Sequence, residues 1–287
     1  ILPYIEMESV YKMFDTTTQI YNQSTNATLA AGYRAYSATA GGLHLTAKGR
    51  DYADPAFPTG WTAAQTTIKT FICPSTPIGA SGRGAGDNGS GLGGVDYMIP
   101  VMSDLNDTSK VRDAAVTNLT KVYGMLGLDK GPLSCSDGTS NTIMIVEDAG
   151  RAYTTVGTFG SGSSRPSPLT TSPKPAVGDV ASNTNARRVY AWADPDAFAN
   201  GFSGPSNDTV SKVAKINNNA SPVGGPTTCS WKTNNCGPND EPFSFHTGGV
   251  TAVLGDGSVR FIRDSIDAVV LKYAIGASDG QITDLDK

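Results

Sequence analysis

Charged side chains are scarce in this 287-residue chain, at 17% of the residues, and Lys and Arg form no cluster. Nucleic-acid binding needs cations that replace the counterions of the phosphates, and the formal net charge here is −4. The sequence therefore predicts no nucleic-acid partner. A run of eighteen apolar residues is also missing, so the sequence as given predicts no membrane-spanning helix.

Cysteine and histidine are rare as well, with four Cys and two His. No C-x2-C pair occurs, and His44 and His246 are far apart in the sequence, so the spacing does not predict a zinc site. An even number of cysteines in an Asn-, Thr- and Gly-rich chain favours two disulfides in an oxidising compartment. The expected pairs are Cys229–Cys236, which closes a short loop, and Cys73–Cys135, and four unpaired thiols are the alternative.

Glycine and proline are abundant, with 33 and 17 residues, and both weaken helix interiors. This composition predicts many loops and strands with only short helices. We expect an α+β fold in which residues 1–287 form a single domain with a modest antiparallel sheet. The Ser-, Pro- and Thr-rich residues 157–186 are expected to form a long exposed loop.

Hydrophobic periodicity gives most of the expected elements. Apolar residues near 3.6 spacing predict a short amphipathic helix from Ile5 to Asp15, and a helix is also expected over 109–118. A strand stopped by Pro74 is expected over Thr67–Cys73. The further expected strands are Val95–Val101, Asn141–Glu147, which follows a turn at Asp137-Gly138, and Arg188–Trp192.

The C-terminal part has the clearest pattern. Gly249–Gly255 and Ser258–Ile262 alternate as two strands, and Asp256-Gly257 between them predicts a two-residue hairpin turn. A helix is expected over Ser265–Ile275, with Asp264 or Ser265 as its N-cap and Gly276 as its C-cap.

Ordered motif blocks carry a resemblance to a known family. The blocks are L-P-Y-I-E-x5-Y-x2-F at 2–14, F-I-C-P-S at 71–75, S-D-G-T-S-N-T-I-M-I-V-E at 136–147 and F-S-F-H-T-G-G-V-T-A-V-L-G-D-G-S-V-R-F-I at 243–262. Together they resemble the pilin-like family with a prepilin-type leader and a C-terminal H-x9-D-G signature, which is expanded in planctomycetes. The motif residues, all expected to be structural, are Asp137, Gly138, Ser140, Asn141, Glu147, His246, Gly248, Gly249, Asp256 and Gly257.

The resemblance implies a role as well as a fold. It implies the globular head of a type IV pilin-like or pseudopilin-like subunit, exported to the cell surface or beyond, in a filament or envelope assembly. The family pattern places a cleavable leader and a hydrophobic helix upstream of Leu2-Pro3-Tyr4, and the expected partners are copies of the chain or other pilin-like subunits bound through that helix. Since the chain starts inside an element, we expect it to be a processed or truncated product.

A binding module for a solute or a surface glycan is the alternative, and one name given to the family points to solute binding. Aromatic side chains would then line the binding surface, the candidates being Tyr33, Tyr36, Trp61, Trp192 and Trp231.

An enzyme is not expected. His246 is the only residue that invites a catalytic interpretation, but an extended chain would place it roughly 30 Å from Asp256. We expect a structural histidine that bonds a backbone carbonyl or the Asn141/Glu147 block. Neither a G-x-S-x-G motif nor a G-K-[ST] phosphate loop is present.

The sequence predicts no cofactor. Calcium is the one alternative to this prediction. Carboxylate and amide oxygens in loops suit this ion, and the possible ligands are Asp194, Asp196, Asn200 and Asp208. A solvated acidic loop is the competing interpretation, because the spaced Asp/Asn pattern of an EF-hand loop is missing.

Overall fold

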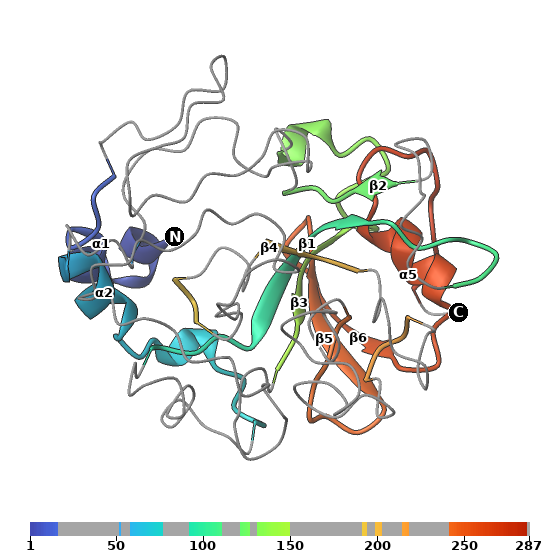
Figure 1. The fold of residues 1–287 in the computed structure, drawn as a ribbon. Coiled ribbons are helices and arrows are strands. Elements are labelled where there is room, and N and C mark those ends of the chain that lie inside the picture. Colours follow the sequence, from blue (N-terminus) through green and yellow to red (C-terminus); the bar gives the residue numbers. More distant parts are fainter. Residues whose placement is uncertain are drawn as a thin grey trace, which may run out of the picture.

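The computed structural model describes residues 1–16, 52, 58–76, 92–110, 121–126, 131–149, 191–193, 199–202, 214–217 and 241–285. Over these residues the fold is α+β, as the sequence predicts: a mostly antiparallel sheet with a few short helices (Figure 1). No helix within the described ranges has the length and apolarity needed to cross a bilayer.

The sheet is built from five strands in the order β2-β1-β3-β5-β6, with each neighbouring pair antiparallel. A sixth strand, β4, pairs with β1 in parallel. The strands are β1 (Tyr97–Ser103), β2 (Val122–Tyr123), β3 (Ile143–Glu147), β4 (Ala199–Gly201), β5 (Gly249–Leu254) and β6 (Val259–Arg263). The predicted strands over 95–101, 141–147 and 249–262 are thus confirmed, with small shifts in their ends.

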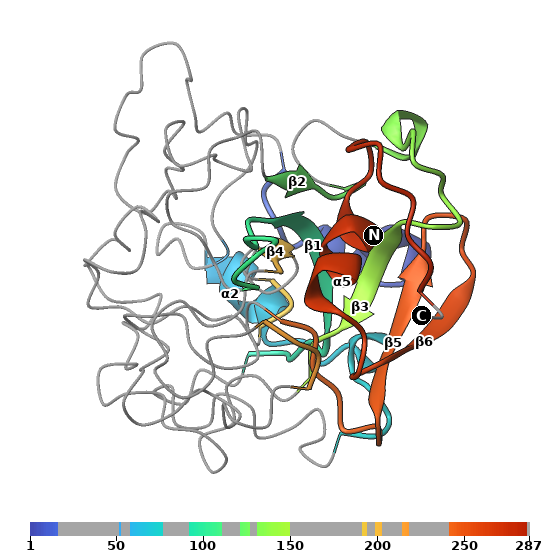
Figure 2. The same cartoon turned by 90° about the vertical axis from the view of Figure 1, so that its right-hand side faces the viewer.

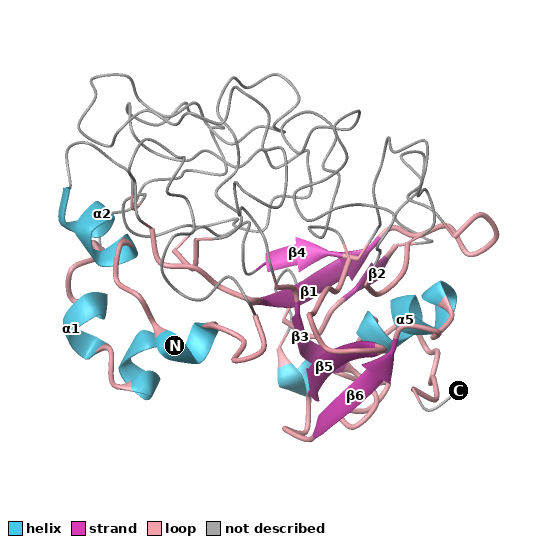
Figure 3. Ribbon diagram, turned by 90° about the horizontal axis from the view of Figure 1, so that it is seen from below, coloured by secondary structure: helices cyan, strands magenta, loops and turns pink. Residues whose placement is uncertain are grey.

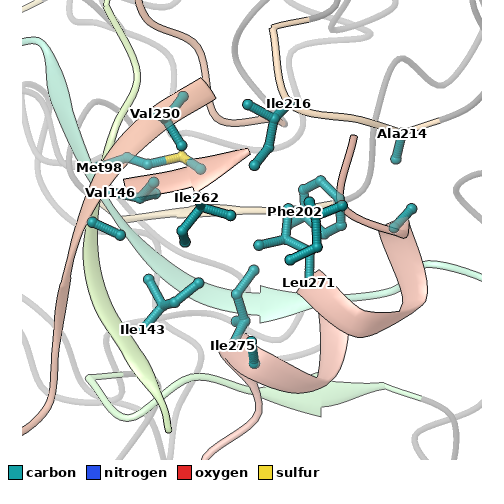
Figure 4. Packing of buried hydrophobic residues seen from close by; sticks show 14 of the residues in the cluster. Met98, Ile143, Val146, Phe202, Ala214, Ile216, Val250, Ile262, Leu271 and Ile275 are labelled. Carbon is teal, nitrogen blue, oxygen red and sulfur yellow. The ribbon is translucent and has the colours of Figure 1, made fainter. Parts of the chain in front are cut away.

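The helix α5 (Ala268–Ile275) lies across β1 and β3 (Figure 2). Between α5 and the sheet, Leu271 and Ile275 meet Ile143 of β3 and Phe202, which follows β4 (Figure 4). All four side chains are almost completely buried. We call the sheet, α5 and this core the sheet region.

The β5–β6 hairpin forms because Val250, Ala252 and Leu254 are buried on one face while Thr251 and Val253 lie on the other. The turn differs from the predicted two-residue type. The Gly257 N–H donates to the Leu254 carbonyl and the Leu254 N–H donates to Ser258, so three residues form the loop. Within this three-residue loop only Gly257 has positive φ, +85°, whereas a type I′ turn would need a second such residue.

Helix α5 begins later than predicted. Its N-cap is Asp267, whose carboxylate accepts a hydrogen bond from the Val269 N–H at 2.8 Å. Asp264 and Ser265 instead belong to the turn after β6. The C-cap, Gly276, is as predicted.

Residues 1–16 and 58–76 form a separate end of the molecule, which we call the N-terminal region (Figures 1 and 3). It contains only short helices: η1 (Leu2–Ile5), α1 (Glu8–Tyr11), α2 (Pro58–Ala64) and η3 (Lys69–Phe71). A further short helix, η4 (Pro132–Ser134), precedes β3. Val10, Ile68 and Phe71 pack with Trp192 as the core of the N-terminal region.

For this region one prediction is only partly confirmed and another is wrong. The helix expected from Ile5 to Asp15 is divided, because Glu6 adopts a left-handed conformation, φ +60°, that ends η1 before α1 begins. The strand expected over 67–73 is a 3₁₀ turn, in which Ile68 and Phe71, three residues apart, are buried on the same side. The expected helix at 109–118, the strand at 188–192 and the loop at 157–186 lie wholly or mostly outside the described residues.

Candidate functional site

A buried carboxylate at the end of β3 holds together three distant parts of the chain. The Glu147 side chain is 4% exposed, and its Oε2 atom accepts a hydrogen bond from the Thr251 N–H of β5 at 2.6 Å. Its Oε1 atom lies 3.2 Å from His246 Nε2 and 3.3 Å from Cys73 Sγ. We call Cys73, Glu147 and His246 the Glu147 cluster.

His246 reaches the cluster because the segment before β5 is fixed locally. The Ser244 hydroxyl donates to the Gly249 carbonyl at 2.7 Å and accepts from the His246 N–H at 3.0 Å. Gly248 has φ +85°, and at Gly249 a Cβ atom would lie 2.1 Å from the Ile262 carbonyl oxygen of β6. Gly248 therefore allows the left-handed backbone before β5, and Gly249 allows β5 to start close against β6. About a third of the imidazole is exposed to solvent.

Cys73 comes from the segment after η3. Its backbone N–H donates to Asp96 Oδ2 at 2.9 Å, and the Asp96 N–H donates to the Phe71 carbonyl. Burial raises the pKa of the Cys73 thiol, and the carboxylates of Glu147 and Asp96 raise it further, since each disfavours a thiolate. Burial also raises the pKa of Tyr97, the β1 residue paired with Glu147, to about 12. Without a cation, the cluster thus holds the neutral thiol.

The expected partner of His246 was a backbone carbonyl or the Asn141/Glu147 block. The imidazole contacts the second of these, at Glu147. Asp256 is not part of the site, since its carboxylate caps the hairpin turn by accepting from the Ser258 N–H and hydroxyl. The sequence does not predict Cys73 at this site, since Cys73 is 74 residues from Glu147 and is expected only to form a disulfide. A usable signal was the F-I-C-P-S block itself, which places Cys73 in a motif.

The first part of the 136–147 block anchors the C-terminal segment. Asp137 is buried, and its carboxylate accepts from the N–H groups of Asp279 and Gly280. Gly138 has φ +98°, and Asn141 donates its side-chain amide to the Asp137 carbonyl, which closes the turn before β3. Ser140 lies in the same turn and lines an open pocket with Asn141 and Arg260.

The expected Cys73–Cys135 disulfide is not present. Both residues are free thiols in separate surroundings: Cys73 lies in the Glu147 cluster, and Cys135 bonds the Thr142 hydroxyl at 3.2 Å. Cys229 and Cys236 lie outside the described residues, and so do the calcium candidates Asp194, Asp196 and Asp208. Of Asn200 only the backbone, in β4, is described.

Comparison with known proteins places the chain in a family. The model of a family described as "Protein of unknown function (DUF1559)" matches residues 1–269. The chain belongs to this family. No curated protein and no solved structure matches it. The match begins at Ile1 and includes the Glu147 cluster, so the cluster lies within the part that the family model covers.

Proposed function

We propose that this chain is the globular head of a pilin-like or pseudopilin-like subunit, displayed at the cell surface or outside the cell in a filament or envelope assembly. One observation carries the proposal: three of the four motif blocks meet at the Glu147 cluster. Cys73 belongs to the first of these, Glu147 ends the second and His246 belongs to the third. The blocks that define the resemblance thus join distant parts of the chain, as expected for a structural head.

The remaining block, at 2–14, packs against the core of the N-terminal region, to which it belongs. Leu2, Ile5 and Met7 contact the core formed by Val10, Phe71 and Trp192. Under our proposal, the upstream hydrophobic helix that the resemblance implies would join the head here. A packed joint would fix the direction in which the head projects from the assembly.

Aromatic side chains support the structural role over glycan capture. Trp192 is buried, 7% exposed, and its indole N–H donates to the Thr66 carbonyl at 2.8 Å. Trp61 stacks on the buried ring of Tyr52 with centroids 6.1 Å apart. Glycan binding needs aromatic faces that are open to the ligand. The other aromatic candidates, Tyr33, Tyr36 and Trp231, lie outside the described residues.

Solute capture remains a second candidate because of the pocket that Ser140 lines. It has a volume of about 380 Å³ and a mainly polar lining that includes Asn141, Arg260, Thr283 and Asp284. This volume lies within the usual range for small-molecule sites, although such sites are normally more apolar. A small polar solute is the class that this lining would suit.

The two functions predict different behaviour. If the chain is a pilin-like head, residues 1–287 alone should remain a monomer or weak oligomer in light scattering, because stable interfaces bury more than about 1,000 Å² with an apolar centre. The product of the full gene should enter membranes or filaments, as seen by cell fractionation and electron microscopy. A full gene that encodes neither a leader nor a hydrophobic helix would refute the pilin-like function. A solute that stabilises the wild-type chain but not the Arg260→Ala variant would favour solute capture.

A further inference from the structure

The Glu147 cluster has the geometry of a metal site. We propose that Cys73 Sγ, Glu147 Oε1 and His246 Nε2 bind a zinc-class divalent cation in the reduced protein. The three donor atoms come from segments 74 and 99 residues apart in sequence, and all lie within 4.8 Å of one another. The sequence does not predict this site, because no pair of its ligands has zinc-motif spacing.

The donor separations fit a tetrahedral ion. With bonds of about 2.3 Å to sulfur and about 2.0–2.2 Å to nitrogen and oxygen, neighbouring ligands of tetrahedral zinc lie about 3.3–3.6 Å apart. The observed separations are 3.2 Å for His246–Glu147, 3.3 Å for Cys73–Glu147 and 3.8 Å for Cys73–His246. The three atoms thus form one face of the tetrahedron, and shifts of a few tenths of an ångström would complete it.

Backbone contacts already hold the donors in place. The second oxygen of Glu147 accepts the Thr251 N–H, the Cys73 N–H donates to Asp96, and the His246 N–H donates to Ser244. Outer contacts of this kind orient metal ligands and strengthen binding. The partly exposed imidazole gives solvent and ions a way in, so a water molecule could supply the fourth ligand.

Charge and donor type select the metal. A thiolate and a carboxylate carry two negative charges, which a divalent cation neutralises. A thiolate with an imidazole suits zinc or cobalt, whereas calcium and magnesium prefer oxygen ligands only. Since metal binding requires a thiolate, binding should release a proton and weaken as the pH falls.

Cobalt(II) is the best first probe, because a tetrahedral thiolate site gives it intense visible bands and a sulfur-to-cobalt charge-transfer band. We expect the reduced, metal-free chain to bind one equivalent with these bands, and Zn²⁺ to displace it. Wild-type protein that shows no thiolate–cobalt band would overturn the proposal and leave the cluster as a hydrogen-bonded trio. This result does not depend on the folding of any variant.

Matched variants locate the site. Cys73→Ser should abolish the charge-transfer band, and His246→Gln should weaken binding at least tenfold, with folding checked by circular dichroism. Cys135→Ser, the other described free thiol, should leave the band unchanged, and so should the double variant Cys229→Ser/Cys236→Ser. A band that survives Cys73→Ser and His246→Gln but is lost in the double variant would place the metal elsewhere and refute the proposal.

Discussion

The sheet region and the N-terminal region bury similar apolar side chains by different means. In the sheet region, regular strand pairing and one helix place Ile143, Leu254 and Leu271 in a common core. In the N-terminal region, short helical turns are held by single contacts such as the Trp192 indole on the Thr66 carbonyl. Periodic pairing spreads stability over many bonds, whereas the N-terminal region depends on a few anchors.

Truncation in the sheet core should have the largest effect. Leu271 is completely buried between α5 and the sheet, so Leu271→Ala should lower the free energy of unfolding by about 3 kcal/mol through lost burial and a cavity. Urea unfolding measures the loss. Val270→Ala, at a partly buried neighbour on the same helix, is the matched control and should cost clearly less. Equal losses would mean that α5 does not pack as described.

The hairpin turn should be the next most sensitive point. Gly257 has φ +85°, a conformation that β-branched residues adopt only with strain, so Gly257→Val should cost about 2 kcal/mol. Gly257→Asn is the control, because asparagine tolerates left-handed backbone much better. Space does not limit either variant, since nothing lies within 4 Å of an added Cβ atom. If Gly257→Val unfolds at a temperature no lower than that of Gly257→Asn, the result would contradict the turn geometry.

An anchor of the N-terminal region can be removed while an aromatic ring is kept in its place. Trp192→Phe should keep the aromatic packing against Phe14 and Phe71 but leave the Thr66 carbonyl without its indole donor, at a cost of about 1.5 kcal/mol. Hydrogen exchange should then rise in 58–76 more than in β5 and β6. Uniform acceleration across both regions would show that they unfold as one unit and that the N-terminal region does not depend on separate anchors.

The smallest expected effect depends on pH. Hydrogen bonds from Lys110 and from the Val269 N–H lower the pKa of Asp267, the N-cap of α5. A lowered folded-state pKa contributes stability above the unfolded value of about 3.9, and this contribution is lost as the pH falls through the folded-state pKa. Asp267→Ala should therefore cost about 1 kcal/mol at pH 7 and less at pH 3.

Asp267→Asn is the control for the cap. It keeps a side-chain acceptor for the Val269 N–H but loses the charge that pairs with Lys110. Its cost at pH 7 should be smaller than that of Asp267→Ala. Chemical unfolding at both pH values measures the two costs, and a pH-independent difference between wild type and Asp267→Ala would contradict a charged cap.

The same contrast explains what the sequence could predict. The β5–β6 hairpin was predictable because alternation and a nearby Asp-Gly turn are local signals. The split at Glu6 and the 3₁₀ turn at 69–71 were not, because both segments pack with distant Trp192, and the turn also accepts a hydrogen bond from distant Asp96. In the candidate site, Glu147 was among the partners expected for His246. Cys73 was missed because its place there depends on the η3 turn, which the sequence did not predict.

The late position of β5 in the chain affects how folding can proceed. Strand β3 ends at Glu147, but its neighbour β5 begins at Gly249, about a hundred residues later, and α5 follows. Such distant pairings close slowly, and a chain made from its N-terminus cannot form this one until Gly249 and the residues after it have been synthesised. The hydrogen bond from the Thr251 N–H to the Glu147 carboxylate can therefore form only after the hundred or so residues between them have been made. We expect a chain that stops before Gly249 to lack the β3–β5 pairing and, with it, the core between the sheet and α5.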